Sequence, residues 1–139
     1  MPAVHIYSDS LLFDNSKKEK FFIGNVICFY ESISLYADKM NIYEHINGNQ
    51  LATAEAKNKN KSVIFYINNL KKSELIKGNS SKLELDFQTG KLSLIGNAII
   101  TRYFQDRIIE YIEGNIIIYF QSIDKYHTQH DFRKMVQEP

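Results

Sequence analysis

The residues best able to carry acid–base or metal chemistry are four histidines, and they are scattered along the chain. His5 lies in an apolar run near the start, His45 precedes an Asn-Gly pair, and His127 and His130 lie in a polar segment near the end. The spacing of the last two would suit a pair of metal ligands, but histidines in a polar tail are more often solvated than metal-bound. The sequence therefore predicts no metal site.

The chain also lacks a convincing nucleophile or acid–base pair. Its single cysteine, Cys28, alternates with Val26 in an apolar stretch, which favours a structural thiol. Glu110 and Glu113 could act as paired carboxylates, but nothing nearby suggests a cleft, and we predict that they are surface charges. The sequence contains no nucleophile elbow, phosphate-binding loop or dinucleotide-binding pattern. We therefore predict no catalytic residue, no cofactor and no enzymatic activity.

A lysine-rich stretch runs from Lys57 to Lys82, where seven lysines accompany a single acid, Glu74. Such a stretch is most often a solvated edge or loop that discourages aggregation. It could instead meet the phosphates of an anionic ligand at the rim of an apolar groove. The whole chain has 17 Lys+Arg against 16 Asp+Glu, so binding to nucleic acid is not predicted.

The composition indicates that strands, rather than helices, position these residues. Isoleucine is abundant beside 9 Phe and 9 Tyr, whereas leucine and alanine are scarce. A length of 139 residues suits one domain with its own core, and a single cysteine cannot form an internal disulfide. The apolar runs are short, so no membrane-spanning helix is predicted, and the first residues show no export-signal pattern.

Turn-forming pairs divide the chain into segments of strand length. Asn47-Gly48 in particular accepts the positive φ angles of a tight hairpin. The other candidate turns are Asn15-Ser16, Asn68-Asn69, Gly78-Asn79 and Thr89-Gly90. The predicted strands are 5–11, 21–30, 32–36, 39–44, 62–67, 82–87, 91–102, 107–111 and 115–121. The stretch 52–57 is the one candidate for a helical turn.

A weak internal repeat links the two halves of the chain. The sequence at 23–27, Ile-Gly-Asn-Val-Ile, recurs at 95–99 as Ile-Gly-Asn-Ala-Ile. A short segment that begins with a small residue follows each copy, at 37–40 and at 114–117. This pattern predicts two stacked copies of one hairpin-based unit.

Alternation assigns one set of apolar side chains to a shared inner face. Leu83, Leu85 and Phe87 alternate with charged residues, as in a strand with one buried face. Gly24 and Gly96 lie in mid-strand, which indicates a bulge or a close approach to the backbone. The inner surface is predicted to be wide, apolar and free of polar groups, and it is either a filled core or a partly open groove. The same alternation, with a period of two residues, also assigns to the inner face Val4, Ile6, Phe22, Val26, Met40, Ile42, Phe65, Ile67, Leu94, Ile100 and Ile117.

A series of short motifs occurs in the order, and with nearly the spacing, of a known family. The motifs are 5–9, 23–26, 37–40, 63–66, 78–83, 95–98 and 112–119. Together they resemble the LptA (OstA-like) family of lipopolysaccharide export proteins from about Val4 to Gln121. The resemblance implies an all-β fold, an open, twisted antiparallel β-jelly roll over residues 4–121, with a polar C-terminal strand or tail at 122–139. The family shares this fold with the periplasmic part of LptC and the N-terminal domain of LptD.

The resemblance further implies a periplasmic bridge protein that carries lipopolysaccharide from the inner to the outer membrane by holding the acyl chains of lipid A. Neither nucleotide nor metal is implied. The sequence departs from the family pattern in two short segments, at Ala54 and at 114–116. These differences put the local turn geometry there in question. The lipid contacts of the family fall on Val4, Ile6, Phe65, Leu83, Leu85 and Phe87.

The resemblance also implies partners. Unpaired strands at the two ends would join the chain head to tail with further copies of itself and with the homologous domains of LptC and LptD. The strands expected to do so are Val4 to Leu11 at one end and Ile116 to Gln121 at the other.

Two other functions stay open at this point. The first is a structural interaction or adaptor module with a closed β core and no lipid ligand. The second is a small hydrolase, which has less support because no acid–base group was found. The lipid-carrying interpretation requires that the two layers of the fold do not seal completely.

Overall fold

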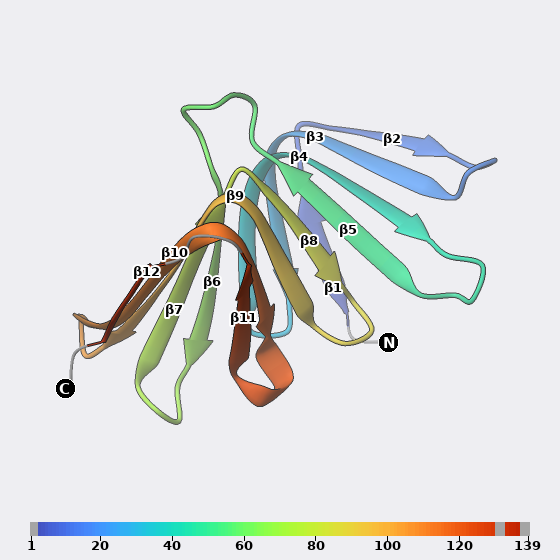
Figure 1. Ribbon diagram of the computed structural model, residues 1–139. Helices are drawn as coiled ribbons and strands as arrows, with labels where there is room; N and C mark the ends of the chain where they lie inside the picture. Colours follow the sequence, from blue (N-terminus) through green and yellow to red (C-terminus); the bar gives the residue numbers. More distant parts are fainter. Residues whose placement is uncertain (1–2, 130–132, 137–139) are drawn as a thin grey trace.

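The computed structural model describes residues 3–129 and 133–136, and most of them lie in antiparallel strands (Figure 1). One 3-10 turn, η1 (Gln121–Ile123), lies between the last long strand and the next. The fold is an all-β, open and twisted jelly roll. The strands are β1 (Val4–Tyr7), β2 (Ser10–Asp14), β3 (Glu19–Tyr30), β4 (Ile33–Glu44), β5 (Gln50–Glu55), β6 (Val63–Asn69), β7 (Glu74–Ser80), β8 (Lys82–Asp86), β9 (Lys91–Phe104), β10 (Arg107–Phe120), β11 (Lys125–Gln129) and β12 (Arg133–Val136).

Four long strands are shared between two layers. Each of β3, β4, β9 and β10 pairs along one half with one short strand and along the other half with another, as β3 does with β1 and β2. Layer A has the order β1-β3-β4-β6-β7-β9-β10-β12, and layer B has the order β2-β3-β4-β5-β8-β9-β10-β11. The layers meet along a ridge where the long strands bend, and they diverge toward a mouth formed by the hairpin tips (Figure 1).

The ridge is built from two Gly-Asn pairs with left-handed backbone conformations. Gly24 and Asn25 have φ of 85° and 48°, and Gly96 and Asn97 have φ of 83° and 47°. Glycine is suited to this region because it carries no Cβ. A Cβ at Gly24 would lie 2.6 Å from the Asp9 carboxylate, so both the conformation and the space favour glycine there. The prediction of a bulge in mid-strand at these glycines is confirmed.

The internal repeat seen in the sequence has a geometric counterpart. Val26 pairs with Ala37 and Ile23 with Lys39, so that two residues of β3 face one residue of β4 at the ridge. The second copy has the same irregularity with the same count, because two residues of β9 face one residue of β10 between the pairs Ile95–Ile116 and Ala98–Gly114. A bulge of one residue bends a strand and increases its twist. The repeated sequence therefore marks the two places where the sheet folds over.

Three predicted boundaries were wrong because of these bends. The predicted strands 32–36 and 39–44 form one strand, β4, and the predicted strands 107–111 and 115–121 form one strand, β10. Conversely, the predicted strand 5–11 is divided at Ser8 and Asp9 into β1 and β2, which belong to different layers. At this corner the Asp9 N–H donates to the Gly24 carbonyl at 2.8 Å.

Two further local predictions were wrong. The stretch 52–57 is not helical, since Ala52 and Ala54 lie in β5 opposite Leu85 and Leu83. The small side chains are buried against these leucines, and such tertiary packing outweighs the helix propensity of alanine. The pair Gly78-Asn79 is not a turn but lies inside β7, where Gly78 is paired with Phe65.

The ends of both layers are single strands with one neighbour each among the described pairings. These are β1 and β2 at the N-terminal edge and β11 and β12 at the C-terminal edge. The expectation that Ile116 to Gln121 forms the C-terminal edge was wrong, because this part of β10 is paired with both β9 and β11. The polar segment that follows β10 provides the actual edge strands.

Candidate functional site

The inner faces of the two layers meet in one apolar cluster. It contains side chains from both layers that are 0–5% exposed, so the middle of the interior is filled in this conformation. Burial of one apolar face on each strand is the arrangement that the alternation of the strands favours.

All fourteen sequence-predicted residues lie in this interior or pack against it. Their inward orientation agrees with the alternation argument, whereas their contact with lipid stays a prediction. Val26, Met40, Phe65, Ile67, Leu83, Leu85, Phe87, Leu94, Ile100 and Ile117 belong to the buried cluster, and Val4, Ile6, Phe22 and Ile42 are partly buried against it.

Sequence reasoning missed several members of the cluster. Ile33 and Leu35 alternate in β4, and that signal was available in the sequence. Ala52 and Ala54 were missed because their segment was interpreted as helical, although they too alternate.

The apolar inner surface reaches solvent at the N-terminal edge. Leu11 of β2 is paired with Phe22, and Phe13 is paired with Lys20, which in turn is paired with Ile42. Leu11 is 59% exposed and Phe13 is 52% exposed. Large exposed apolar side chains that continue a buried surface are a usual mark of a binding site. This edge is therefore where a long apolar ligand could meet the interior without displacing the core.

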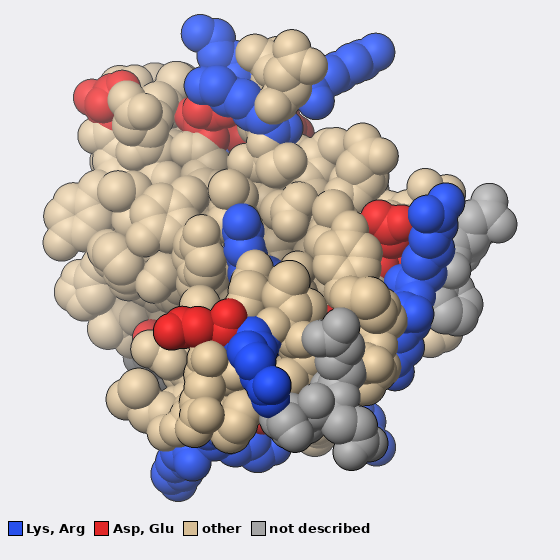
Figure 2. All heavy atoms as spheres, turned by 90° about the vertical axis from the view of Figure 1, so that its left-hand side faces the viewer, with Lys and Arg blue, Asp and Glu red and all other residues tan. Residues whose placement is uncertain are grey.

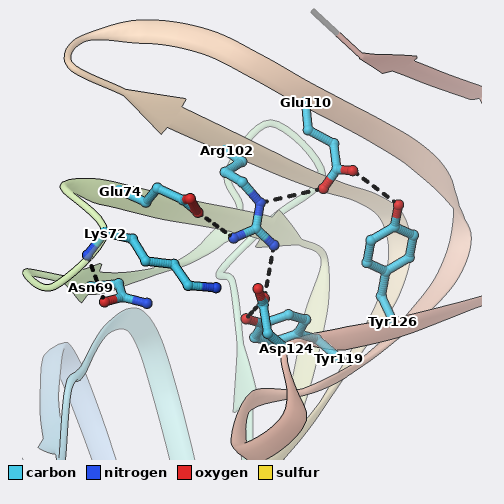
Figure 3. Close-up of polar contacts among 8 residues, drawn as sticks. All are labelled: Asn69, Lys72, Glu74, Arg102, Glu110, Tyr119, Asp124 and Tyr126. Atoms are coloured by element: carbon cyan, nitrogen blue, oxygen red, sulfur yellow. Dashed lines mark hydrogen bonds and ion pairs between the residues drawn. The ribbon is translucent and has the colours of Figure 1, made fainter. Parts of the chain in front are cut away.

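The interior is not free of polar groups, contrary to the prediction. Arg102 of β9 lies on the inner face, two residues after the buried Ile100, and its side chain is only 11% exposed. It donates to Glu74 of β7 through Nη1 at 2.8 Å and is 3.5 Å from Glu110 of β10 through Nε (Figure 3). Its Nη2 donates at 2.8 Å to Asp124, which belongs to layer B. One guanidinium therefore links three strands of layer A to the facing layer.

Two tyrosines of layer B complete this Arg102 cluster. The Tyr119 hydroxyl donates to Asp124 Oδ1 at 2.6 Å, and the Tyr126 hydroxyl donates to Glu110 Oε2 at 3.1 Å (Figure 3). Glu110, predicted to be a surface charge, is thus turned inward, whereas Glu113 points outward and contacts Tyr111 and Arg133. The two carboxylates lie on opposite faces because they are three residues apart in a strand.

The electrostatics of the cluster favour the charged forms of Asp124 and Arg102. Burial alone would raise the pKa of Asp124, but hydrogen bonds from Arg102 and Tyr119 and the charge of Lys72 together lower the pKa below its usual value of 3.8. Burial likewise opposes the charge of Arg102, yet hydrogen bonds to Asp124 and Glu74 raise its pKa overall. The pKa of Tyr119 is raised, first by burial and then by its hydrogen bond to Asp124. At neutral pH Asp124 and Arg102 therefore form a fixed ion pair, to which the neutral Tyr119 hydroxyl donates.

We predict that the contribution of Asp124 to stability is lost in acid. Its pKa is lower in the folded state than in the unfolded chain, where it has its usual value of 3.8. The stabilisation is thus fully present above about pH 4 and declines as the pH falls through the folded-state pKa. Asp124→Asn should lower the free energy of unfolding by about 1 kcal/mol at pH 7, since this side chain is partly exposed. Urea unfolding should show that the difference from the wild type shrinks at pH 3. Asp106→Asn, in the β9–β10 turn, controls for the loss of one negative charge, and an equal difference at both pH values would contradict the prediction.

The comparisons with known proteins agree with this architecture. Residues 5–125 match the family model described as LptA/(LptD N-terminal domain) LPS transport protein. The chain belongs to this family. Membership assigns it a role in lipopolysaccharide transport and confirms the resemblance inferred from the seven motifs. None of the curated protein sequences compared with the chain matches it significantly.

A solved structure of the LptA family has the same fold. The crystal structure of LptH, the LptA homologous periplasmic component of the lipopolysaccharide transport device of Pseudomonas aeruginosa, superposes with a TM-score of 0.83. The alignment covers 99% of this chain and 96% of LptH at 14% sequence identity. At that identity the similarity establishes the fold, and the jelly roll of this LptA-family chain is thereby confirmed.

Other candidate groups of this LptA-family chain do not form a reaction centre. Cys28 is buried, and burial raises the pKa of its thiol to about 12, as the structural interpretation requires. His5 is exposed on β1, His45 stacks edge-on against Tyr43, and His130 is outside the described residues. Within residues 3–129 and 133–136, no group of three or more His, Cys, Asp or Glu could hold a metal ion, and no helix is long and apolar enough to cross a membrane.

The lysine-rich stretch is divided between the ridge and the mouth. Lys57, Lys59 and Lys61 are exposed in the loop between β5 and β6, where positive side chains gather at the top of Figure 2. Lys71 and Lys72 instead lie in the tip between β6 and β7, beside the Arg102 cluster. The first group is a solvated loop remote from the mouth, whereas the second lies where it could meet an anionic group at the rim of the interior. The other two lysines, Lys77 and Lys82, lie within β7 and β8.

Proposed function

We propose that this chain binds lipopolysaccharide through the acyl chains of lipid A and carries it across the periplasm. The observation that supports this function best is the apolar surface between the layers, which reaches solvent at the N-terminal edge from Met40 through Phe22 to Leu11. Burying an acyl chain of about a dozen methylenes at roughly 0.8 kcal/mol each gives on the order of 10 kcal/mol. Such binding requires no covalent step, cofactor or metal.

The unpaired edges support assembly with other copies of the same fold. A further strand can add to β1 and β2 at one end and to β11 and β12 at the other. Strand addition of this kind uses the free backbone donors and acceptors of an edge. We propose head-to-tail association with further copies of this chain and with the homologous domains of LptC and LptD, which would align their apolar interiors.

Photo-crosslinking on neighbouring residues tests the lipid-binding proposal. A photoreactive phenylalanine analogue at Phe22 would face the interior, whereas the same analogue at Phe21 would face outward from the same strand. In cells that export lipopolysaccharide, we expect an adduct from position 22 and at least about tenfold less from position 21. Equal yields at both positions, or an adduct at neither, would count against the proposal.

The filled interior favours a second candidate function, that of a structural interaction module with a closed core. Phe65, Leu85 and Leu94 are 0% exposed, as in an ordinary packed domain. If position 22 gave no lipid adduct while the chain still bound its partners through the edge strands, the module would be the better description.

A further inference from the structure

One turn of layer B crosses the mouth and contacts layer A at two points. This segment, residues 121–124, consists of η1 and Asp124, and we call it the strap. At its start, Gln121 Nε2 donates to Ser32 Oγ at 2.8 Å, in the turn between β3 and β4. At its end, Asp124 accepts from Arg102 at 2.8 Å. Both contacts join the facing layers rather than neighbouring strands.

The strap lines a pocket that reaches the apolar cluster. The pocket, of about 320 Å³, has Gln121 and Asp124 of the strap in its wall together with Ile67 and Ile76 of layer A and Tyr119 of layer B. These three side chains are 5%, 2% and 2% exposed and are members of the buried apolar cluster. The pocket therefore adjoins the predicted lipid-binding surface at Ile67, and two residues of the strap, Gln121 and Asp124, form the layer B side of its wall together with Tyr119.

The local conformation aims Asp124 at the facing layer. The residue has φ of 51° and ψ of 49°, a left-handed conformation that aspartate tolerates, and its N–H donates to the Gln121 carbonyl at 3.3 Å. Tyr119 then fixes the carboxylate by donating to the same oxygen that accepts from Arg102. The carboxylate is thus positioned for the contact across the mouth.

Polar contacts, rather than packing, hold the strap in place. None of the residues of η1 is buried, and the side chain of Ile123 is 59% exposed. Gln121 Oε1 is buried without a hydrogen-bond partner, an arrangement that offsets part of the stabilisation from its Nε2. By contrast, the neighbouring cross-layer contact, from the Tyr30 hydroxyl to the Phe87 carbonyl at 2.6 Å, is buried. The strap can therefore be released without unpacking the core, whereas the Tyr30 contact cannot.

We propose that residues 121–124 are a releasable cover over a lateral entrance to the apolar interior, latched by Asp124 on Arg102 and by Gln121 on Ser32. This inference rests on the proposed lipid-carrying function and specifies how the same site is closed. Tyr126, which donates to Glu110, keeps β11 in place when the strap moves. A long-chain acyl group then enters the pocket between Ile67 and Tyr119.

A thiol-labelling experiment tests the opening without a ligand. Ile67→Cys places a thiol in the pocket wall, and Val63→Cys places one on the same face of the same strand, away from the pocket. The native Cys28 is buried and gives little background. Adding Asp124→Ala and Gln121→Ala should raise the labelling rate at position 67 about tenfold or more and leave position 63 unchanged. Glu113→Gln, which breaks an exposed ion pair within layer A, should change neither rate.

A second arm links the strap to uptake of an apolar ligand. The probe is cis-parinaric acid, whose fluorescence rises in an apolar site. Joining Ser32→Cys to Gln121→Cys with a short, reducible bis-maleimide should slow probe uptake at least tenfold, and reduction should restore it. Each single-cysteine variant, treated in the same way, lacks the cross-layer link and should take up the probe at least as fast as the wild type.

The outcomes separate the inference from the function on which it rests. Unchanged labelling at position 67 would contradict the proposal that the strap covers the pocket. Faster labelling with probe uptake unaffected by the linker would contradict the proposal that the pocket is an entrance, without contradicting the carrier function. If no form of the protein bound the probe, the wild type included, the carrier function itself would fail and the entrance would fail with it.

Discussion

Arg102→Met is expected to lower the free energy of unfolding by about 3 kcal/mol. The substitution keeps the apolar stem but leaves three acidic side chains without their shared cation. Glu74 and Glu110 are each only 16% exposed, and removing one partner of a buried ion pair costs about 3–5 kcal/mol. We take the lower end because Asp124 is partly solvated. Thermal unfolding should show a melting temperature lower by roughly 10 °C for a domain of this size.

The exposed pair of Arg133 and Glu113 provides the matched control. Its Nε–Oε1 distance is 3.5 Å, the same as between Arg102 and Glu110, but the Arg133 side chain is 86% exposed. Arg133→Met should therefore change stability by no more than about 0.5 kcal/mol. Adding Glu74→Gln to Arg102→Met should recover part of the loss by removing one uncompensated charge. Equal effects of Arg102→Met and Arg133→Met would show that the cluster is only a surface network.

Gly78→Ala is expected to destabilise the protein by about 3 kcal/mol, although it adds a single methyl group. A Cβ at this position would overlap the ring of Phe65, which lies directly across from it on β6 and is 0% exposed. Overpacking of a filled core typically costs about 1–3 kcal/mol, and the buried ring has no free space into which to move.

A double-mutant cycle with Phe65→Ala separates this clash from other effects of the glycine. Phe65→Ala alone should cost about 3–5 kcal/mol through the cavity that it leaves. In that background the added methyl of Gly78→Ala would occupy vacated space, so the two effects should fall short of additivity by at least about 1 kcal/mol. Denaturant unfolding of the four proteins measures this coupling. Strict additivity would show that the cost of alanine arises from the backbone rather than from the ring.

The inner face could be predicted from the sequence because it depends on a period of two. Leu83, Leu85 and Phe87 show the alternation without interruption, and their strand is straight and entirely within layer B. The same parity, continued from Leu92 through Ile100, also points Arg102 inward, so a signal for the cluster was present. Its partners could not be found in this way, since Glu74 and Asp124 reach Arg102 only through the pairing of β7 with β9 and the closure of the mouth.

The predicted boundaries failed wherever local pattern and layer geometry disagree. A bulge interrupts the alternation at Asp38 and Asn115 while the strand continues. The sequence pattern of one strand therefore resembles that of two separate strands. The alanines of β5 have helical propensity, but their small size is what the leucines of β8 require. The edge strands β11 and β12 were hidden by their polarity, which suits strands that face solvent on one side.

The unbroken passage of four strands over the ridge constrains how the molecule can deform. Since β3, β4, β9 and β10 each continue from one layer into the other, the layers cannot slide past or detach from each other there. The two layers can therefore move apart only by a hinge motion, with little displacement at the two Gly-Asn bends and the greatest displacement at the hairpin tips. A ligand bound between the layers would therefore strain the contacts at the hairpin tips first. The continuous backbone of the four strands would then supply the force that closes the layers again after the ligand dissociates.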